Sequence, residues 1–420
     1  MDKLAIKGGQ PCISGSFPTK LLGVALYGEE EMRELADVIG RKAPFRHYGL
    51  SYPDKVKRFE EMVSKRFETP YALAVSSGSA ALFCAAASIG LEPGDEVILP
   101  TLTWYSDFGC IVNAGATPVF AGIDETLNLD PADFEARITP KTKAVIVVHY
   151  QGGAASMDEI LYIAKARGIV VIEDFSQAFG GEYKGKRLGT LGDIGVASFQ
   201  MNKMITAGEG GLMITTHQAF YERAVRYHDL GVVRSVFEER FADAELCDED
   251  RSFSGNQYRM SELAGAVLCA QFEKLDGILK KCSRYHSYIK NALSGSKRFS
   301  FRPTERGECG ITVFIRFNSC EDARHFTEAV IAEGVPVGPS SACVNMLTFK
   351  QIVNKRVMFP KMPPFAPGSP GQNVVYEDVD LMEATDEMIN RHLAIGIGPL
   401  YDDKNIEDII TAIKKVDSLL

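Results

Sequence analysis

The chain has 420 residues, of which 46 are basic and 55 acidic, and its formal charge of −9 argues against nucleic acid or an anionic membrane as the main partner. No run of about 20 apolar residues and no signal-like N-terminus is present, so we expect neither a membrane-spanning helix nor export. The nine cysteines are scattered without the spacing of a zinc site, which predicts reduced thiols, a cytoplasmic protein and no metal.

Strands and helices alternate over residues 71–216. Strands are predicted at 71–75, 96–100, 117–120, 143–149, 168–174, 196–200 and 211–215, with helices such as 79–90 and 158–167 between them. Several of these strands are unbroken runs of Val and Ile, which is typical of strands buried on both faces. The alternation predicts an α/β fold with a mostly parallel sheet covered by helices.

The remainder of the chain has a different pattern. Residues 237–250 are polar and acidic, as in a surface loop, and residues 259–295 read as a long helix. A second unit follows, with a strand at 311–317, a helix at 321–334 and an amphipathic closing helix over 406–416. We therefore expect an N-terminal arm with a substrate loop (1–50), a large α/β domain (51–295) and a small α+β domain (296–420).

The segment around Lys203 is the strongest candidate for chemistry. Lys203 follows a predicted strand, and a glycine-rich turn from Gly208 to Gly211 comes soon after it. Partial desolvation of a lysine frees its amine to act as a nucleophile, as in enzymes that form Schiff bases. A surface lysine in an ordinary hairpin has the same pattern, so this segment alone leaves both interpretations open.

Three further features lie where predicted strands end. Asp174 ends a buried strand, where a carboxylate needs a cationic partner such as a protonated pyridine nitrogen. Gly78 and Ser79 open a helix whose N–H groups favour a phosphate, and Trp104, the only tryptophan, is placed to stack on a flat ring. Helix capping or core packing explains each feature alone. Together with Lys203 they are the set that pyridoxal 5'-phosphate requires.

These residues resemble the sugar aminotransferases of the DegT/DnrJ/EryC/StrS family, which have the aspartate-aminotransferase (type I) fold. The most specific similarity is Ser198, Lys203 and the Gly208-Glu-Gly-Gly211 turn; residues 94–100, 115–120, 173–178, 189–193 and 258–262 are also similar. The likeness extends over nearly the whole chain. It implies a large domain with a mostly parallel seven-stranded sheet, a smaller C-terminal α+β domain, and a homodimer whose sites draw on both chains.

The resemblance also implies roles for single residues. Lys203 would form the internal aldimine with pyridoxal 5'-phosphate and then shuttle the substrate proton. Asp174 would pair with the pyridine nitrogen. The other expected cofactor contacts are Gln177 at the phenolic oxygen, Trp104 on the ring, Gly78, Ser79 and Ser198 at the phosphate, and Asn256 or Gln257 from the neighbouring subunit. Relatives that dehydrate a keto-sugar carry histidine in place of Lys203, so the lysine favours transamination.

The expected reaction is ping-pong, from L-glutamate to a keto-sugar or sugar-aldehyde acceptor. Arg46, His47 and Tyr48 lie in a loop where relatives contribute to the sugar pocket, often across the dimer. His149 follows a strand end, where it either lines the site or is a structural core histidine. Within the family the overall pattern is most similar to members that act on an 8-oxo-3,8-dideoxy-octulosonate in lipopolysaccharide biosynthesis. A nucleotide-linked keto-sugar or a keto-cyclitol is the alternative acceptor, and a non-catalytic sensor that kept the fold is the alternative of another class.

Overall fold

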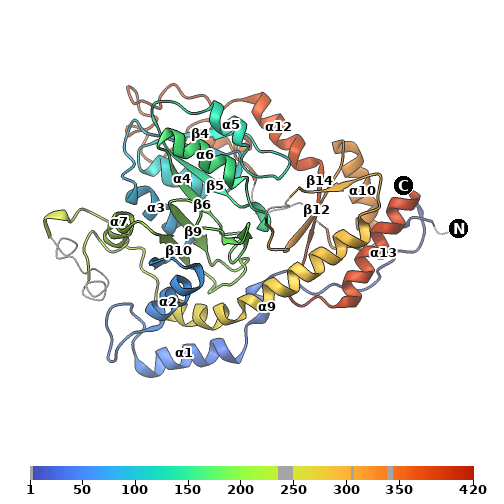
Figure 1. The fold of residues 1–420 in the computed structure, drawn as a ribbon, viewed down its shortest axis with the longest axis horizontal. Coiled ribbons are helices and arrows are strands. Elements are labelled where there is room, and N and C mark those ends of the chain that lie inside the picture. Colours follow the sequence, from blue (N-terminus) through green and yellow to red (C-terminus); the bar gives the residue numbers. More distant parts are fainter. Residues whose placement is uncertain (1–2, 235–248, 304–306, 338–343) are drawn as a thin grey trace.

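The computed structural model describes residues 3–234, 249–303, 307–337 and 344–420. These residues form a large sheet covered by helices and a small sheet beside it (Figure 1). The large sheet has seven strands in the order β1-β10-β9-β6-β5-β2-β4. β10 runs antiparallel to both its neighbours, and the other adjacent strands are parallel. The expected mostly parallel sheet is confirmed.

The elements of this part lie close to their expected positions. The strands are β1 (Tyr71–Val75), β2 (Glu96–Pro100), β4 (Thr117–Ala121), β5 (Thr142–Val148), β6 (Val170–Asp174), β9 (Ile194–Ser198) and β10 (Gly211–Thr215). The helices are α2 (Lys55–Phe67), α3 (Gly78–Ser88), α4 (Tyr105–Asn113), α5 (Pro131–Ala136), α6 (Met157–Arg167), α7 (Gln218–His228) and α9 (Glu262–Leu293). The predicted strand 196–200 is displaced by two residues, because the chain turns toward Lys203 directly after Ser198.

Helices cover both faces of the large sheet. Successive residues of a strand point to opposite faces, so Ala72 and Ala74 join one apolar core while Leu73 and Val75 join another. The first core contains α2, α6 and α9, and the second contains α3 and α7. Burial on both faces is the physical reason for the unbroken apolar runs in the sequence.

The small sheet has three antiparallel strands, β11 (Ser300–Phe301), β12 (Thr312–Arg316) and β14 (His392–Gly396). Helices α10 (Cys320–Ala332), α12 (Val379–Asn390) and α13 (Asp403–Leu419) lie around it (Figure 1). The long helix α9 passes from beneath the large sheet to the small one. It therefore ties the two sheets together.

The C-terminal region is not confined to the small sheet. β13 (Val344–Asn345) pairs with β3 (Leu102–Thr103), and the Tyr376 hydroxyl donates a 2.8 Å hydrogen bond to the Pro118 carbonyl. Residues between 344 and 376 thus pack into the core on one face of the large sheet. The division of the chain into 1–50, 51–295 and 296–420 stays a prediction. Residues 237–248 of the expected acidic loop lie outside the described residues.

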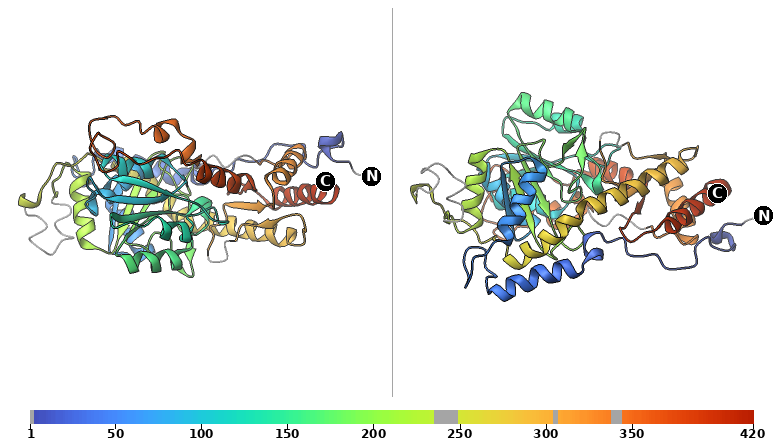
Figure 2. Two further views of the ribbon diagram at one scale, coloured as in Figure 1. Left: turned by 90° about the horizontal axis from the view of Figure 1, so that it is seen from above. Right: turned by 60° about the horizontal axis from the view of Figure 1, so that its bottom comes forward.

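The N-terminal arm runs beside the small sheet toward α1 (Glu29–Arg41), as the right view of Figure 2 shows. The Glu333 carboxylate holds it by accepting N–H bonds from Ala5 (2.8 Å) and Cys12 (3.0 Å). Helix α1 lies against α9. No helix among the described residues is long and apolar enough to cross a membrane.

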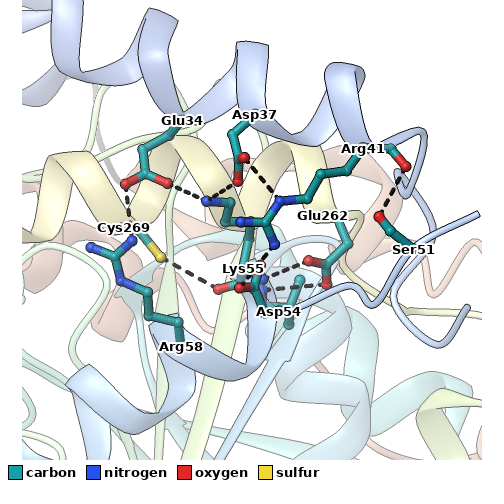
Figure 3. Close-up of polar contacts among 10 residues, drawn as sticks. Glu34, Asp37, Arg41, Ser51, Asp54, Lys55, Arg58, Glu262 and Cys269 are labelled. Atoms are coloured by element: carbon teal, nitrogen blue, oxygen red, sulfur yellow. Dashed lines mark hydrogen bonds and ion pairs between the residues drawn. The ribbon is translucent and has the colours of Figure 1, made fainter. Parts of the chain in front are cut away.

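Polar contacts join α1, α2 and α9 (Figure 3). Lys55 Nζ lies 2.7 Å from a carboxylate oxygen of Glu34 and 2.7 Å from one of Asp37. Glu262, at the start of α9, accepts N–H bonds from Lys55 (2.6 Å) and Val56 (3.3 Å). A carboxylate of one helix thereby caps the first turn of another.

Candidate active site

A cavity of about 490 Å³ opens where β5, β6 and β9 end. Parallel strands end at the same sheet edge, which is where α/β sheets bind ligands. The predicted residues that line this cavity are Gly78, Ser79, Trp104, Asp174, Gln177, Ser198 and Lys203. The structure thus brings together residues that are up to 125 positions apart in the chain.

Asp174 is the last residue of β6 and lies in the cavity wall. Its side chain is buried, and one carboxylate oxygen accepts the Ser176 N–H at 2.9 Å. The preceding residue, Glu173, points to the other face of the sheet. There its carboxylate accepts N–H bonds from Gly189, Leu191 and Gly192 at 2.6–2.9 Å. Of these two consecutive acids, only Asp174 is placed to meet a cation in the cavity.

Lys203 lies in the loop between β9 and β10. The loop is closed by the pairing of Gln200 with Gly208, and the buried residues Met204 and Ile205 anchor it on the core. The Lys203 carbonyl also accepts an N–H bond from Gly23 of the N-terminal arm, at 3.3 Å. These contacts hold the backbone on both sides of Lys203, while its side chain faces the cavity.

The start of α3 forms an anion cradle. Ser77 caps the helix, and the first N–H groups, those of Gly78 and Ser79, have no acceptor within the helix. The hydroxyls of Ser79 and Ser106 lie 2.5 Å apart. A Cβ on Gly78 would come 2.6 Å from Ser198 Cβ, so a larger residue would fill the cradle. The donors and the space fit a phosphate group.

The remaining predicted contacts line other parts of the wall. Trp104 precedes α4 and keeps 48% of its surface exposed, which leaves a ring face for a flat group. The side-chain carbonyl of Gln177 accepts the Gln151 N–H at 3.0 Å. Gln151 has φ of +48°, a strained backbone conformation for a residue other than glycine. Carboxylate, lysine, cradle and exposed aromatic face together fit pyridoxal phosphate.

Asp107 is a residue that sequence reasoning missed. It lies in the first turn of α4, is completely buried, and accepts a hydrogen bond from the Thr103 hydroxyl. Burial, together with the nearby charge of Asp174, raises the pKa of Asp107 well above its usual range. Its position in the sequence predicts only an acid in the first turn of a helix. The neighbouring residues in the sequence do not indicate that it is buried near Asp174.

Arg46 does not line the cavity of its own chain, and its role in substrate binding stays a prediction. The guanidinium is buried, lies 2.5 Å from the Glu60 carboxylate and donates to the Ala74 carbonyl. Breaking this pair would leave a buried charge, so Arg46 is held in the core. The residues around Arg46 in the sequence do not indicate that it pairs with Glu60.

His47 and Tyr48 are also away from the cavity. The buried side chain of His47 lies 3.0 Å from Asp229, and desolvation lowers the pKa of this histidine. Burial opposes ionisation of Asp229, but hydrogen bonds from His47, Arg234 and Arg259 hold its pKa well below the usual range. Tyr48 lies on the surface, 67% exposed. The structure does not place either residue at the predicted substrate site.

His149 turns away from the cavity as well, because it points to the same face of the sheet as Glu173. Its Nε2 lies 3.0 Å from a Glu173 oxygen, and its Nδ1 accepts the Ala155 N–H at 3.2 Å. Both ring nitrogens therefore have partners within the protein, and the side chain is fully buried. This burial fits a structural core histidine, the alternative that the sequence left open, and a role of His149 in substrate binding stays a prediction.

Asn256 and Gln257 are exposed and do not line the cavity of their own chain. Asn256 donates a 2.8 Å hydrogen bond to the Tyr227 hydroxyl. A role for either residue in a neighbouring subunit stays a prediction.

Comparison with known proteins decides the family. The sequence profile of the DegT/DnrJ/EryC1/StrS aminotransferase family matches residues 29–414. The chain belongs to this family. It is accordingly an aminotransferase that uses pyridoxal phosphate, as the residues of the cavity indicate.

Three relatives are similar over different lengths. GDP-perosamine synthase of Escherichia coli O157:H7 is 38% identical over 227 residues, 54% of this chain and 59% of that protein. Spore coat polysaccharide biosynthesis protein SpsC of Bacillus subtilis (strain 168) is 29% identical over 393 residues, 93% of this chain and 95% of that protein. L-glutamine:2-deoxy-scyllo-inosose aminotransferase of Streptomyces kanamyceticus is 33% identical over 323 residues, covering 74% and 75%.

Solved structures confirm the fold. 3-Amino-5-hydroxybenzoic acid synthase has a TM-score of 0.75 at 24% identity, over 97% of this chain and 100% of that one. DesV of S. venezuelae has a TM-score of 0.75 at 23% identity, covering 93% and 95%. The fold expected from the resemblance, that of type I pyridoxal-phosphate enzymes, is the fold observed.

Proposed function

We propose that this aminotransferase moves the amino group of L-glutamate to a carbonyl-bearing sugar in a ping-pong reaction, in the cytoplasm and as a homodimer. The observation that carries the proposal is that Asp174, at the end of β6, and Lys203, in the loop after the neighbouring strand β9, line one cavity with Gly78 and Ser79. A sensor that had lost catalysis would not need to retain all of these groups together.

Each residue has a separate task in this proposal. When bound, pyridoxal phosphate supplies an electron-accepting ring that stabilises negative charge at the substrate carbon. Asp174 would hold the proton on the pyridine nitrogen, and the N–H groups of Gly78 and Ser79 would bind the phosphate. Trp104 would cover the ring face and exclude water from it.

Lys203 would have two tasks. Its amine would hold the cofactor's aldehyde carbon, and once displaced by the amino donor it would be free to act as a general base. Lys203 Nζ would then take the proton from the α carbon of glutamate. The buried residues Met204 and Ile205 support this, because they anchor the backbone next to Lys203 while its side chain faces the cavity.

For the acceptor we propose a sugar acid, an 8-oxo-3,8-dideoxy-octulosonate used in lipopolysaccharide biosynthesis. The overall sequence pattern supports this acceptor, but Arg46 does not, since it is paired in the core. A nucleotide-linked keto-sugar or a keto-cyclitol is the second candidate. The similarity to GDP-perosamine synthase and to a scyllo-inosose aminotransferase favours this second group.

The test is product analysis of the cofactor-loaded enzyme with ¹⁵N-labelled L-glutamate and no acceptor. Transamination predicts one equivalent of 2-oxoglutarate per site, with the label kept on the enzyme. Addition of each candidate acceptor should then move the label into a sugar amine, which mass spectrometry detects. Catalytic release of labelled ammonia, or no 2-oxoglutarate at all, would contradict the proposal.

A further inference from the structure

One cation of the cavity wall has no part in the cofactor scheme. The charged residues that line the cavity are Lys20, Lys203, Asp174 and Glu209. Lys203 and Asp174 are assigned to the cofactor, and Glu209 belongs to the loop after Lys203. Lys20 comes from the N-terminal arm and is exposed, and no residue in the described part of the chain forms an ion pair or hydrogen bond with its ammonium group. It is therefore available to an anionic ligand.

The arm is held at this position by close backbone packing. A Cβ on Gly398 would come 2.5 Å from the Thr19 carbonyl oxygen, and one on Gly396 would come 3.0 Å from Lys20 Cδ. Because the Gly398 contact is with the arm backbone, a side chain at position 398 would displace the arm from the end of β14. The aliphatic part of Lys20 thus lies over Gly396, which also lines the cavity.

A row of polar groups connects Lys20 with the cofactor residues. Thr312 lies directly across from Gly396 in the small sheet, and its hydroxyl donates to the Gln151 side-chain carbonyl at 3.1 Å. The Gln151 N–H in turn donates to Gln177 at 3.0 Å. Because its side-chain carbonyl is used by Thr312, Gln151 presents its amide N–H₂ as a donor. The Lys20 ammonium and the Gln151 amide are thus two donors that line the same cavity as Asp174 and Lys203.

We propose that Lys20 binds a carboxylate group of the substrate, with Gln151 as the second donor. The inference rests on the proposed function and deepens it, since both glutamate and a sugar acid carry carboxylates. A charge-assisted N–H···O bond is the strongest polar contact that this part of the wall offers. The apolar side chains of Leu22 and Ile397 line the same region and suit the carbon chain that joins the carboxylate to the reacting carbon.

The test measures binding to the cofactor-loaded enzyme by titration calorimetry. The probes are glutarate for the donor, gluconate for a sugar acid, sorbitol as the neutral counterpart of gluconate, and GDP for a nucleotide diphosphate. The variants are Lys20→Gln and Lys20→Arg, with Lys7→Gln as the control, because Lys7 is an exposed lysine of the same arm outside the cavity.

Lys20→Gln should weaken glutarate or gluconate binding by about tenfold, while Lys20→Arg keeps most of the affinity and Lys7→Gln all of it. The carboxylate that loses affinity identifies the substrate that Lys20 serves. Glutarate and gluconate affinities that both stay unchanged in Lys20→Gln would overturn the inference. A loss confined to GDP would also overturn it, in favour of a phosphate. Neither result would affect 2-oxoglutarate formation by the parent enzyme, so the two proposals fail separately.

Discussion

At the scale of residues, the consecutive acids Glu173 and Asp174 have different tasks: Glu173 stabilises the fold, and Asp174 lines the cavity. The Glu173 carboxylate is fully buried and accepts three backbone N–H bonds in addition to its contact with His149. Asp174 has a single N–H bond from Ser176 and faces the cavity. Alternation along the strand, rather than the type of residue, assigns these two functions.

The pair gives a matched prediction. Asp174→Ala should lower kcat by about 10²–10⁴-fold, because a charge that stabilises the reacting ring is lost, and should change the free energy of unfolding by only about 1 kcal/mol. Glu173→Ala should instead lower the free energy of unfolding by about 3–5 kcal/mol, since three buried N–H groups lose their acceptor. Urea denaturation and steady-state kinetics on both variants check this. Equal losses of stability would contradict it.

The sequence predicted the cavity residues that follow strand ends, because a buried strand shows in the composition and its carboxyl end has a known place in an α/β fold. It did not give the buried partners of Arg46 and His149, because their pairing with Glu60 and Glu173 cannot be read from local pattern. It also missed Asp107. Burial of a charged or polar side chain depends on contacts distant in the chain, and a single sequence carries no sign of them.

At the scale of elements, the start of α2 depends on a residue 207 positions later. Asp54 precedes α2 but makes no side-chain cap, and Glu262 of α9 accepts the N–H groups of Lys55 and Val56 instead (Figure 3). Burial is the main cause that raises the pKa of Glu262, to about 7. The long helix was predicted from its pattern, but its capping of α2 was not predictable.

The raised pKa of Glu262 makes stability depend on pH. Between about pH 4.5, the ordinary carboxyl value, and pH 7 the folded protein keeps a proton that the unfolded chain releases, so this residue's contribution falls as pH rises. Glu262→Gln cannot titrate and should lack that fall, which is on the order of 1–3 kcal/mol. Urea denaturation at several pH values between 4.5 and 7.5 checks this.

A second variant, Glu92→Gln at an exposed turn, serves as the control and should follow the parent protein. If the stability difference between the parent and Glu262→Gln were the same at every pH, the proposed titration of Glu262 would be disproved.

At the scale of the whole molecule, the exposed residues Asn256 and Gln257 lie outside the cavity of their own chain. If two chains share their sites, as we propose, these two residues complete the phosphate cradle of the neighbour. The homodimer then is the unit of activity rather than a result of packing alone.

Hybrid dimers test this sharing. Lys203→Ala should be inactive through its own site, and the double variant Asn256→Ala with Gln257→Ala should be impaired through the neighbour's site. After unfolding and refolding as a mixture, about a quarter of the sites should have all their residues and recover activity. A mixture that forms mixed dimers yet stays inactive would refute shared sites.

The central claim is that Lys203 holds the cofactor and that an amino donor displaces it. The most direct measurement is the near-UV and visible absorbance of the purified protein with pyridoxal phosphate, before and after L-glutamate, for the parent and for Lys203→Ala. The account predicts a visible band in the parent that glutamate removes, and no such band in Lys203→Ala. A parent band that no amino acid changes, or an identical band in Lys203→Ala, would contradict it.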